Sequence, residues 1–206
     1  MTVCGARLWG RPLSNPDNAF FAILDLEWTS WQGSVGRGWS EDFEEREIVE
    51  IGAVKLSNNP TLDEQGRMGV LTKPVINPEL SDYFINLTGI TQQQINEKAI
   101  DFADAINLLI EFLRPDCYPV YTFGNDGDVL EYNCRIKSIP YPFRDGLFEN
   151  IRPVFANAFK VEEYTLASGR LPEDMGFDAP HRAHRAVDDC LCVAEALRIF
   201  RKQNLF

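Results

Sequence analysis

The chain lacks any apolar run that could cross a membrane. No stretch of about 18 or more apolar residues occurs in its 206 residues, so no membrane-spanning helix is expected. The N-terminal segment MTVCGARLWGRPLSNPDNAF has neither the apolar core nor the cleavage site of a signal peptide. We therefore expect a protein that is not secreted and has no membrane partner.

Paired cysteines are also absent. The five cysteines are odd in number and show no zinc-like spacing. Cys190 and Cys192 are two positions apart in a helical pattern, so they point to different faces and are poor joint ligands. Free thiols in a reducing compartment fit this pattern better than disulfides, and we expect a cytoplasmic location.

Positive charge is scarce. The 20 Lys and Arg residues are outnumbered by 31 Asp and Glu residues, which gives a net charge of −11. Long-range attraction to a polyanion should therefore be weak, which argues against a protein that coats long duplexes. The 45% hydrophobic content suffices for one substantial core. We expect a single domain over residues 1–206, with residues 1–18 as an extended lead-in.

Three segments in the first part of the chain have strand patterns. Residues 20–24 form a continuous apolar run, which predicts a strand buried on both faces. Residues 47–56 and 69–75 predict two more strands with a turn-rich segment between them, which indicates a hairpin meander.

The segment 31–45 is rich in Gly and acidic residues and has no periodicity, so it predicts a long exposed loop. Its Trp31 and Trp39 are capable of stacking on bases, but we expect them to pack against the domain.

Helical patterns dominate the rest of the chain. Residues 102–113 carry an apolar stripe that Asp101 would cap and that stops before Pro115. A strand at 118–123, a helix at 128–136 and a last helix at 186–201 follow. Strands first, then helices alternating with strands, predict an α/β fold with a mixed sheet flanked by helices.

Two acids interrupt the apolar run at the end of the first strand. Because side chains alternate along a strand, Asp25 and Glu27 share one face while Leu24 and Leu26 share the other. Two such acids are costly to bury unless they are paired or bound to metal. The alternative interpretation is a strand end that emerges into solvent.

Asp126 lies where a strand turns into a helix, a position that exposes a side chain at the edge of a sheet. The alternative here is helix capping by Asn125, Asp126 or Asp128.

His184 and Asp189 are five residues apart. One continuous helix would turn them about 140° apart, so His184 is expected on the loop before the last helix and Asp189 on the helix. A histidine near a helix start is otherwise an ordinary surface residue. His181 and Asp188 are expected to be solvated.

Together these segments resemble the DEDDh 3′–5′ exonucleases. Asp25 to Thr29 is similar to the family's D-x-E-x-T pattern, and the segment 184–189 matches H-x-A-x-x-D. Residues 78–91 are similar to its P-x-L-S-x-F-x-x-L-T-G-I-T segment. The resemblance spans about residues 20–200 and is greatest to the branch of histone-mRNA-type exoribonucleases and bacterial sporulation-inhibitor-like exonucleases. It implies a ribonuclease H-like three-layer fold with a mixed five-stranded sheet flanked by helices.

The resemblance also implies a mechanism. The protein would be a two-metal-ion exonuclease that releases nucleoside 5′-monophosphates from the 3′ end of single-stranded RNA or DNA. Two Mg²⁺ or Mn²⁺ ions would be held by Asp25, Glu27, Asp126 and Asp189, with His184 as the general base. The expected substrate-binding residues are Leu26, Trp28, Thr29, Leu87 and His184.

Two questions stay open at this stage. Leu130, four residues after Asp126, fits the family pattern and favours Asp126 as the third carboxylate, but Asp128 is an alternative. The rival functions are a catalytically silent nucleic-acid-binding module of the same fold and a polymerase-associated proofreading subunit. No polymerase-binding tail is recognisable after the last helix, at RKQNLF.

Overall fold

The computed structural model describes residues 19–114, 117–178 and 183–203, and the expected lead-in at 1–18 lies outside them. One five-stranded sheet has the strand order β3-β2-β1-β4-β5. β1 pairs antiparallel with β2, as does β2 with β3, whereas β1–β4 and β4–β5 are parallel. The predicted mixed sheet and hairpin meander are therefore confirmed. The strands are β1 (Phe20–Trp28), β2 (Ile48–Ser57), β3 (Glu64–Leu71), β4 (Cys117–Thr122) and β5 (Phe148–Asn150).

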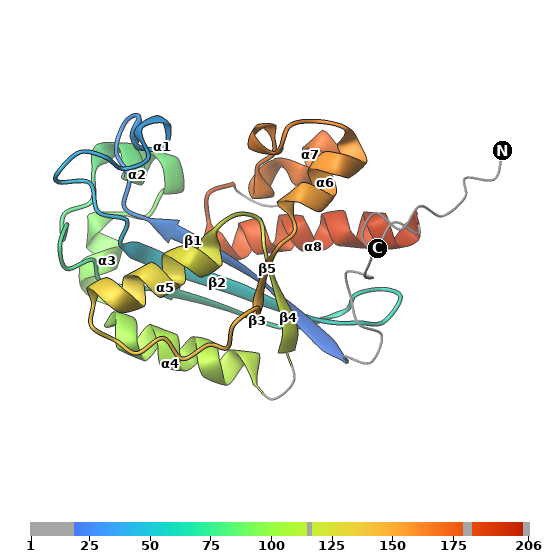
Figure 1. The fold of residues 1–206 in the computed structure, drawn as a ribbon, viewed down its shortest axis with the longest axis horizontal. Helices are drawn as coiled ribbons and strands as arrows, with labels where there is room; N and C mark the ends of the chain where they lie inside the picture. The colour runs from blue at the N-terminus through green and yellow to red at the C-terminus, as the bar shows by residue number, and fades with distance from the viewer. Residues whose placement is uncertain (1–18, 115–116, 179–182, 204–206) are drawn as a thin grey trace.

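Helices cover both faces of this sheet. Figure 1 shows α8 along one face with α6 and α7 beside it, and α4 and α5 on the opposite face. No helix in the described part of the chain is long and apolar enough to cross a membrane. The helices are α1 (Ser34–Arg37), α2 (Asp82–Thr88), α3 (Gln92–Lys98), α4 (Phe102–Leu113), α5 (Asp126–Ile136), α6 (Arg152–Phe159), α7 (Leu171–Asp174) and α8 (Ala186–Lys202).

The alternation of side chains along β1 decides which layer the two acids face. Phe21 and Ile23 pack in the core under α8, whereas Leu24 packs in the core under α4 and α5. Asp25 and Glu27 continue the series of Phe21 and Ile23. Both acids therefore lie on the α8 side of the sheet.

The third strand differs from its prediction. The expected strand at 69–75 is observed as Glu64–Leu71, and the chain has left the sheet by residue 73. β3 is an edge strand whose residues are exposed or half-buried and include Glu64, Arg67 and two glycines. Such a strand needs no apolar run, because one side of its backbone faces away from the sheet.

The segment 31–45 is more ordered than the predicted exposed loop. It contains α1, and the buried Ser34 donates a hydrogen bond to Glu44 at 2.9 Å while Arg37 forms an ion pair with the same carboxylate. Trp39 lies against Trp28, with ring centroids 6.1 Å apart, and its Nε1 donates to the Thr29 carbonyl at 3.0 Å. The expected packing of Trp39 against the domain is confirmed.

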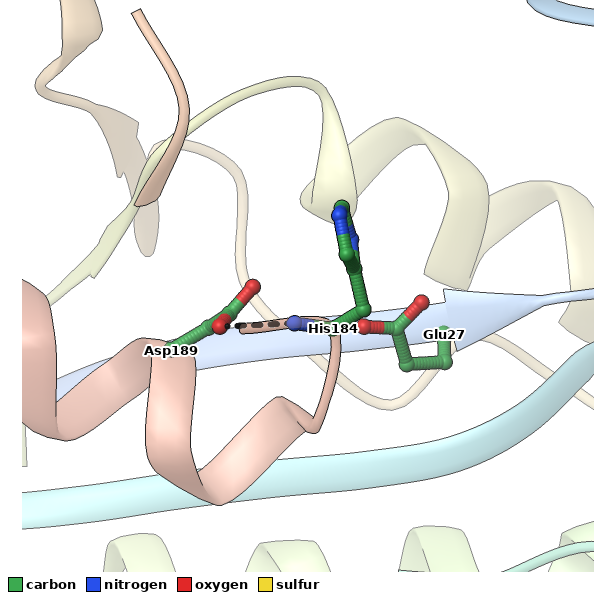
Figure 2. A group of neighbouring side chains, drawn as sticks. All are labelled: Glu27, His184 and Asp189. Carbon is green, nitrogen blue, oxygen red and sulfur yellow. Dashed lines mark hydrogen bonds between the residues drawn. The ribbon is translucent and has the colours of Figure 1, made fainter. Parts of the chain in front are cut away.

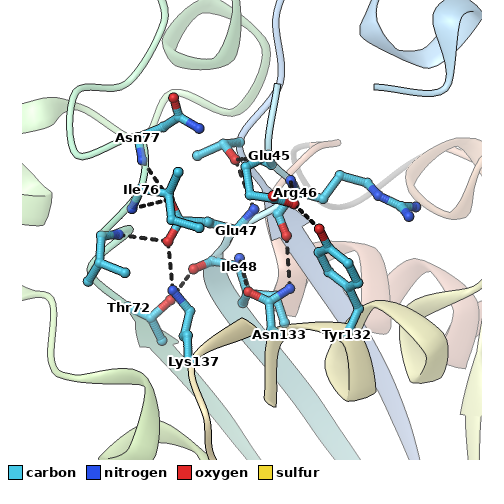
Figure 3. A network of polar contacts seen from close by, with 12 residues as sticks. Glu45, Arg46, Glu47, Ile48, Thr72, Ile76, Asn77, Tyr132, Asn133 and Lys137 are labelled. Carbon is cyan, nitrogen blue, oxygen red and sulfur yellow. Dashed lines mark hydrogen bonds and ion pairs between the residues drawn. The ribbon is translucent and has the colours of Figure 1, made fainter. Parts of the chain in front are cut away.

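A buried polar network fastens α5 to the start of β2 (Figure 3). Glu47 pairs with Lys137 at 2.7 Å and accepts the N–H groups of residues 75–77. Asn133 accepts the Ile48 N–H at 3.0 Å and donates to the Arg46 carbonyl at 2.8 Å. Burial alone would raise the pKa of Glu47, but Lys137 and the N–H donors bring it below its ordinary value. The network thus fixes the helix that begins with Asp126.

Two paired glycines let the start of α8 approach the sheet. Gly52 is paired with Asp25 on one side and with Gly69 on the other. A Cβ atom at Gly52 would lie 2.4 Å from the Ala186 carbonyl carbon and 2.5 Å from the Val187 nitrogen. Only a residue without a side chain fits there, because the backbone of a helix cannot be displaced as a flexible side chain can.

Gly52→Ala should therefore destabilise the protein by about 1–3 kcal/mol, the usual cost of overpacking a well-packed core. Gly66→Ala in β3 is the matched control, because its Cβ would meet Phe112 at an ordinary 3.7 Å. Urea unfolding of both variants measures the difference, and equal stabilities would contradict the close approach.

Candidate active site

Four carboxylates from three elements meet at one end of the sheet. Asp25 and Glu27 come from β1, Asp126 is the first residue of α5, and Asp189 lies in α8. Asp25, Asp126 and Asp189 retain only 9%, 5% and 4% of their surface exposed, and Glu27 is half-buried. The arrangement concentrates negative charge in a place with little water to screen it.

Asp126 and Asp128 lie in different surroundings. Asp126 Oδ1 accepts the backbone N–H of Leu26 at 3.2 Å. Leu26 lies between Asp25 and Glu27 in β1, so this hydrogen bond holds the Asp126 carboxylate beside that part of the strand. Asp128 is exposed and lines a different pocket of about 250 Å³, which Tyr141 and Phe148 also line. The geometry thus brings Asp126, and not Asp128, to the other carboxylates.

His184 lies on the loop before α8. It has a left-handed backbone with φ of +64°, and its N–H donates to Asp189 Oδ1 at 3.1 Å (Figure 2). Ser168 donates to the other oxygen of Asp189, also at 3.1 Å. One candidate ligand atom each of Glu27, His184 and Asp189 lies within 4.8 Å of the other two. His181 lies outside the described residues.

A fifth acid, which the sequence pattern did not single out, supports this loop. Glu50 on β2 is buried and is paired with Glu27 across the sheet. It accepts hydrogen bonds from Arg185, the shortest at 2.7 Å, and from the backbone N–H of Ala186 at 3.0 Å. Glu50 therefore satisfies a free N–H at the start of α8 and anchors the residue next to His184. Glu50 is two residues before Gly52 on the same face of β2, and this position is the feature of the sequence that could have indicated its role.

Burial and mutual repulsion raise the pKa values of the clustered acids. Burial first, and then the charges of Asp126 and Asp189, place the pKa of Asp25 well above its ordinary value. Burial followed by Asp189 and Glu50 does the same for the pKa of Glu27. Burial raises the pKa of Asp126 to about 6 and that of Asp189 to about 7, although hydrogen bonds oppose both shifts. The cluster is thus poised to exchange its protons for cations near neutral pH.

The pKa of the His184 imidazole shifts in the opposite direction to the pKa values of the acids. Partial burial lowers its pKa below the ordinary value, because the protonated ring loses hydration. The ring is therefore largely neutral at pH 7 and able to accept a proton.

A pocket of about 300 Å³ opens beside the carboxylates. Of the predicted substrate-binding residues, Leu26, Trp28, Leu87 and His184 line it. Thr29 instead lies beneath the surface, where its hydroxyl accepts the Glu47 N–H at 3.0 Å and donates to the Glu45 carbonyl. The structure therefore places Thr29 as a support of the pocket rather than on its lining. Trp39 and Val35 add a wall from the segment 31–45.

A family model for exonucleases (RNase_T) matches residues 22–197, which include all four carboxylates and His184. The chain belongs to the exonuclease family. The human 3′-5′ exoribonuclease 1 is 28% identical over 183 residues, which cover 85% of this chain and 50% of that protein. The probable 3′-5′ exonuclease KapD of Bacillus subtilis is 26% identical and covers 89% of this chain and 85% of that protein. This exonuclease chain spans about half the length of its mammalian exoribonuclease 1 relatives.

Solved structures confirm the ribonuclease H-like fold. The nuclease domain of 3′hExo, a DEDDh family member bound to rAMP, matches with a TM-score of 0.78 and 24% identity, over 93% of this chain and 96% of that chain. The cell-death related nuclease 4 matches with a TM-score of 0.72 and 20% identity, over 90% and 64% of the two chains. These likenesses establish the fold of this exonuclease family member.

The donor set fits the divalent metal ions that DEDDh exonucleases use. Carboxylate oxygens are the ligands that hard divalent cations prefer, and three of the four acids are almost fully buried. The ion pair of Arg185 is made with Glu50, and the charge of Arg185 lowers the pKa of Glu27 less than burial and the neighbouring acids raise it. A cation between them would stabilise the ionised carboxylates against the burial and repulsion that raise their pKa values.

The metal-free protein should therefore lose stability as the pH rises from 5 to 7.5. A carboxyl group with a raised pKa in the folded chain favours folding below its ordinary pKa and opposes folding once it ionises, so the loss follows the pKa values of about 6 and about 7. Urea unfolding in a chelator should show a fall of at least about 1 kcal/mol, one pKa unit of differential binding. Excess Mg²⁺ should reverse the fall.

Asp189→Asn should reduce this pH dependence, whereas Glu97→Gln, which removes an exposed charge on α3, should not. A pH profile that neither Mg²⁺ nor Asp189→Asn changes would contradict the proposed repulsion.

Proposed function

We propose that this protein is a metal-dependent 3′–5′ exonuclease that removes nucleoside 5′-monophosphates from the 3′ end of single-stranded nucleic acid. The observation that supports this most is the meeting of four carboxylates beside a pocket that two of them, Glu27 and Asp189, line together with a neutral histidine. Membership in the exonuclease family agrees with it. The relatives named as exoribonucleases favour RNA over DNA as the substrate.

Asp25, Glu27, Asp126 and Asp189 would hold two divalent ions, Mg²⁺ or Mn²⁺. Bound ions of this kind supply an activated water and neutralise charge on a phosphodiester. The burial of the three aspartates excludes bulk water, which strengthens every electrostatic interaction at the site. Leu26, Trp28 and Leu87 would contact the terminal nucleotide from the pocket wall, with Thr29 supporting them from below.

His184 would act as the general base. Its neutral imidazole takes a proton from the attacking water as that water bonds to phosphorus and the bond to the 3′ oxygen of the preceding nucleotide breaks. The hydrogen bond from its backbone N–H to Asp189 keeps the loop against α8. The released 3′ oxygen takes a proton from solvent, and the product is a 5′-monophosphate.

The test of this function uses 5′-labelled single-stranded RNA and DNA oligomers with a 3′-hydroxyl or a 3′-phosphate. In Mg²⁺ or Mn²⁺ the 3′-hydroxyl oligomers should shorten one nucleotide at a time, and a chelator should stop the reaction. The 3′-phosphate should block or strongly slow it. Cleavage of a circular strand at an equal rate would indicate an endonuclease and overturn the proposal.

His184→Ala should slow hydrolysis roughly 10²–10⁴-fold, the usual contribution of a general base, while leaving strand binding largely intact. His181→Ala is the control and should have little effect. Single-turnover rates decide between them, and the opposite ranking would show that the base is assigned to the wrong histidine.

Asp126→Asn should abolish turnover at ordinary Mg²⁺, because an amide supplies neither the charge nor the second strong oxygen ligand. Asp128→Asn should keep most activity, since two positions along a helix rotate a side chain by about 200°. Rates for both variants across a Mn²⁺ titration provide the comparison. A dead Asp128 variant beside an active Asp126 variant would refute the site while leaving the family unaffected.

A further inference from the structure

One cation in the active-site pocket, Arg152, forms no ion pair with the residues that the structure describes. Arg152 is the first residue of α6 and lines the same pocket as Glu27, His184 and Asp189. Its Nε is buried and makes no hydrogen bond, and no ion pair of its guanidinium is found among the described residues. The guanidinium instead lies 5.3 Å from the ring centroid of Phe123. A buried donor without an acceptor destabilises the folded protein, so the presence of this one calls for an explanation.

Comparable cations near this end of the sheet have partners. Arg185 pairs with the buried Glu50, and Arg37 with the buried Glu44. Arg170 lines the same pocket but is largely exposed and lies 3.4 Å from Asp174. Arg152 therefore differs in having both a place in the pocket and a buried donor, Nε, that makes no hydrogen bond.

The position of Arg152 is set by its neighbours. Its backbone N–H donates to Asn150 at 2.9 Å, and the next residue, Pro153, belongs to the first turn of α6. A Cβ atom at Gly124 would lie 3.1 Å from Arg152 Nη2 and 3.5 Å from Asp126 Oδ2. The guanidinium and the Asp126 carboxylate thus approach the same point, and a side chain at Gly124 would press on the guanidinium.

We propose that Arg152 is a substrate-contacting residue whose guanidinium binds a non-bridging oxygen of the phosphodiester beside the carboxylate cluster. The inference rests on the proposed nuclease function. A phosphate is an anion whose oxygens match the planar donors of arginine, so it would satisfy the buried Nε. It also needs a positive contact to approach four carboxylates on a chain with a net charge of −11.

The same geometry suits a second role, in which Arg152 acts on Asp126 alone. The charge of Arg152 opposes the rise of the Asp126 pKa, an effect smaller than that of burial. A residue that acted only in this way would alter turnover and its pH dependence without touching the substrate. Binding measurements separate the two roles, because only a phosphate contact contributes to the salt dependence of strand affinity.

The experiment measures anisotropy of a labelled single-stranded RNA with a 3′-hydroxyl, in Mg²⁺, at several salt concentrations. All proteins carry His184→Ala to prevent degradation. Arg152→Gln should weaken binding roughly 10–100-fold, the range for a hydrogen bond to a charged group. It should also lower the slope of log affinity against log salt by about 0.7, the value for one phosphate on a single strand. Arg152→Lys should keep the slope and lose part of the affinity.

Arg114→Gln is the control, because it removes one exposed positive charge at the end of α4, on the other face of the sheet. Its slope and affinity should match those of the parent. Unchanged affinity and slope for Arg152→Gln at an unchanged urea midpoint would overturn the inference, as would an equal loss for Arg114→Gln. A parent that neither binds the strand nor, with His184 restored, degrades it would instead overturn the proposed function.

Discussion

The mutual repulsion of four carboxylates in a poorly hydrated site is the constraint on which the rest of the structure depends. Burial raises the pKa values of Asp25, Glu27, Asp126 and Asp189, and neighbouring carboxylates raise those of Asp25, Glu27 and Asp189 further, so folding carries an electrostatic cost at this site. Proteins tolerate such strain where it serves binding or catalysis. Divalent cations would relieve it, which links the stability of the fold to the proposed chemistry.

The scaffold can keep the acids together because each comes from an element that is fixed elsewhere. The Glu47 and Asn133 network ties the second half of α5 to β2, at Asn133 and Lys137. Gly52 allows the backbone of α8 to approach the sheet closely, and Glu50 accepts a hydrogen bond from the first turn of that helix. These two contacts fix the position of Asp189 on α8. Rigid elements, rather than loops, thus carry the carboxylates, while His184 lies on a loop held by one of them.

Much of this architecture could be predicted from the sequence, because local patterns determine it. The helix at 102–113 and the last helix were placed almost to the residue, and strand alternation put Asp25 and Glu27 on one face. The edge strand β3 was misplaced since its polar and glycine residues leave no apolar signal. Glu50 with Arg185, and the order of the segment 31–45, depend on contacts between side chains that no local pattern records.

The central claim is that these carboxylates form one site for divalent cations. The most direct measurement is calorimetric titration of the metal-free protein with Mn²⁺ at pH 7.5. The account predicts two ions bound per chain, protons released on binding, and loss of at least one ion in Asp25→Asn, because the charges of the other three acids all act on Asp25 and raise its pKa. Binding of no ion, or equal binding by the Asp25→Asn variant, would contradict it.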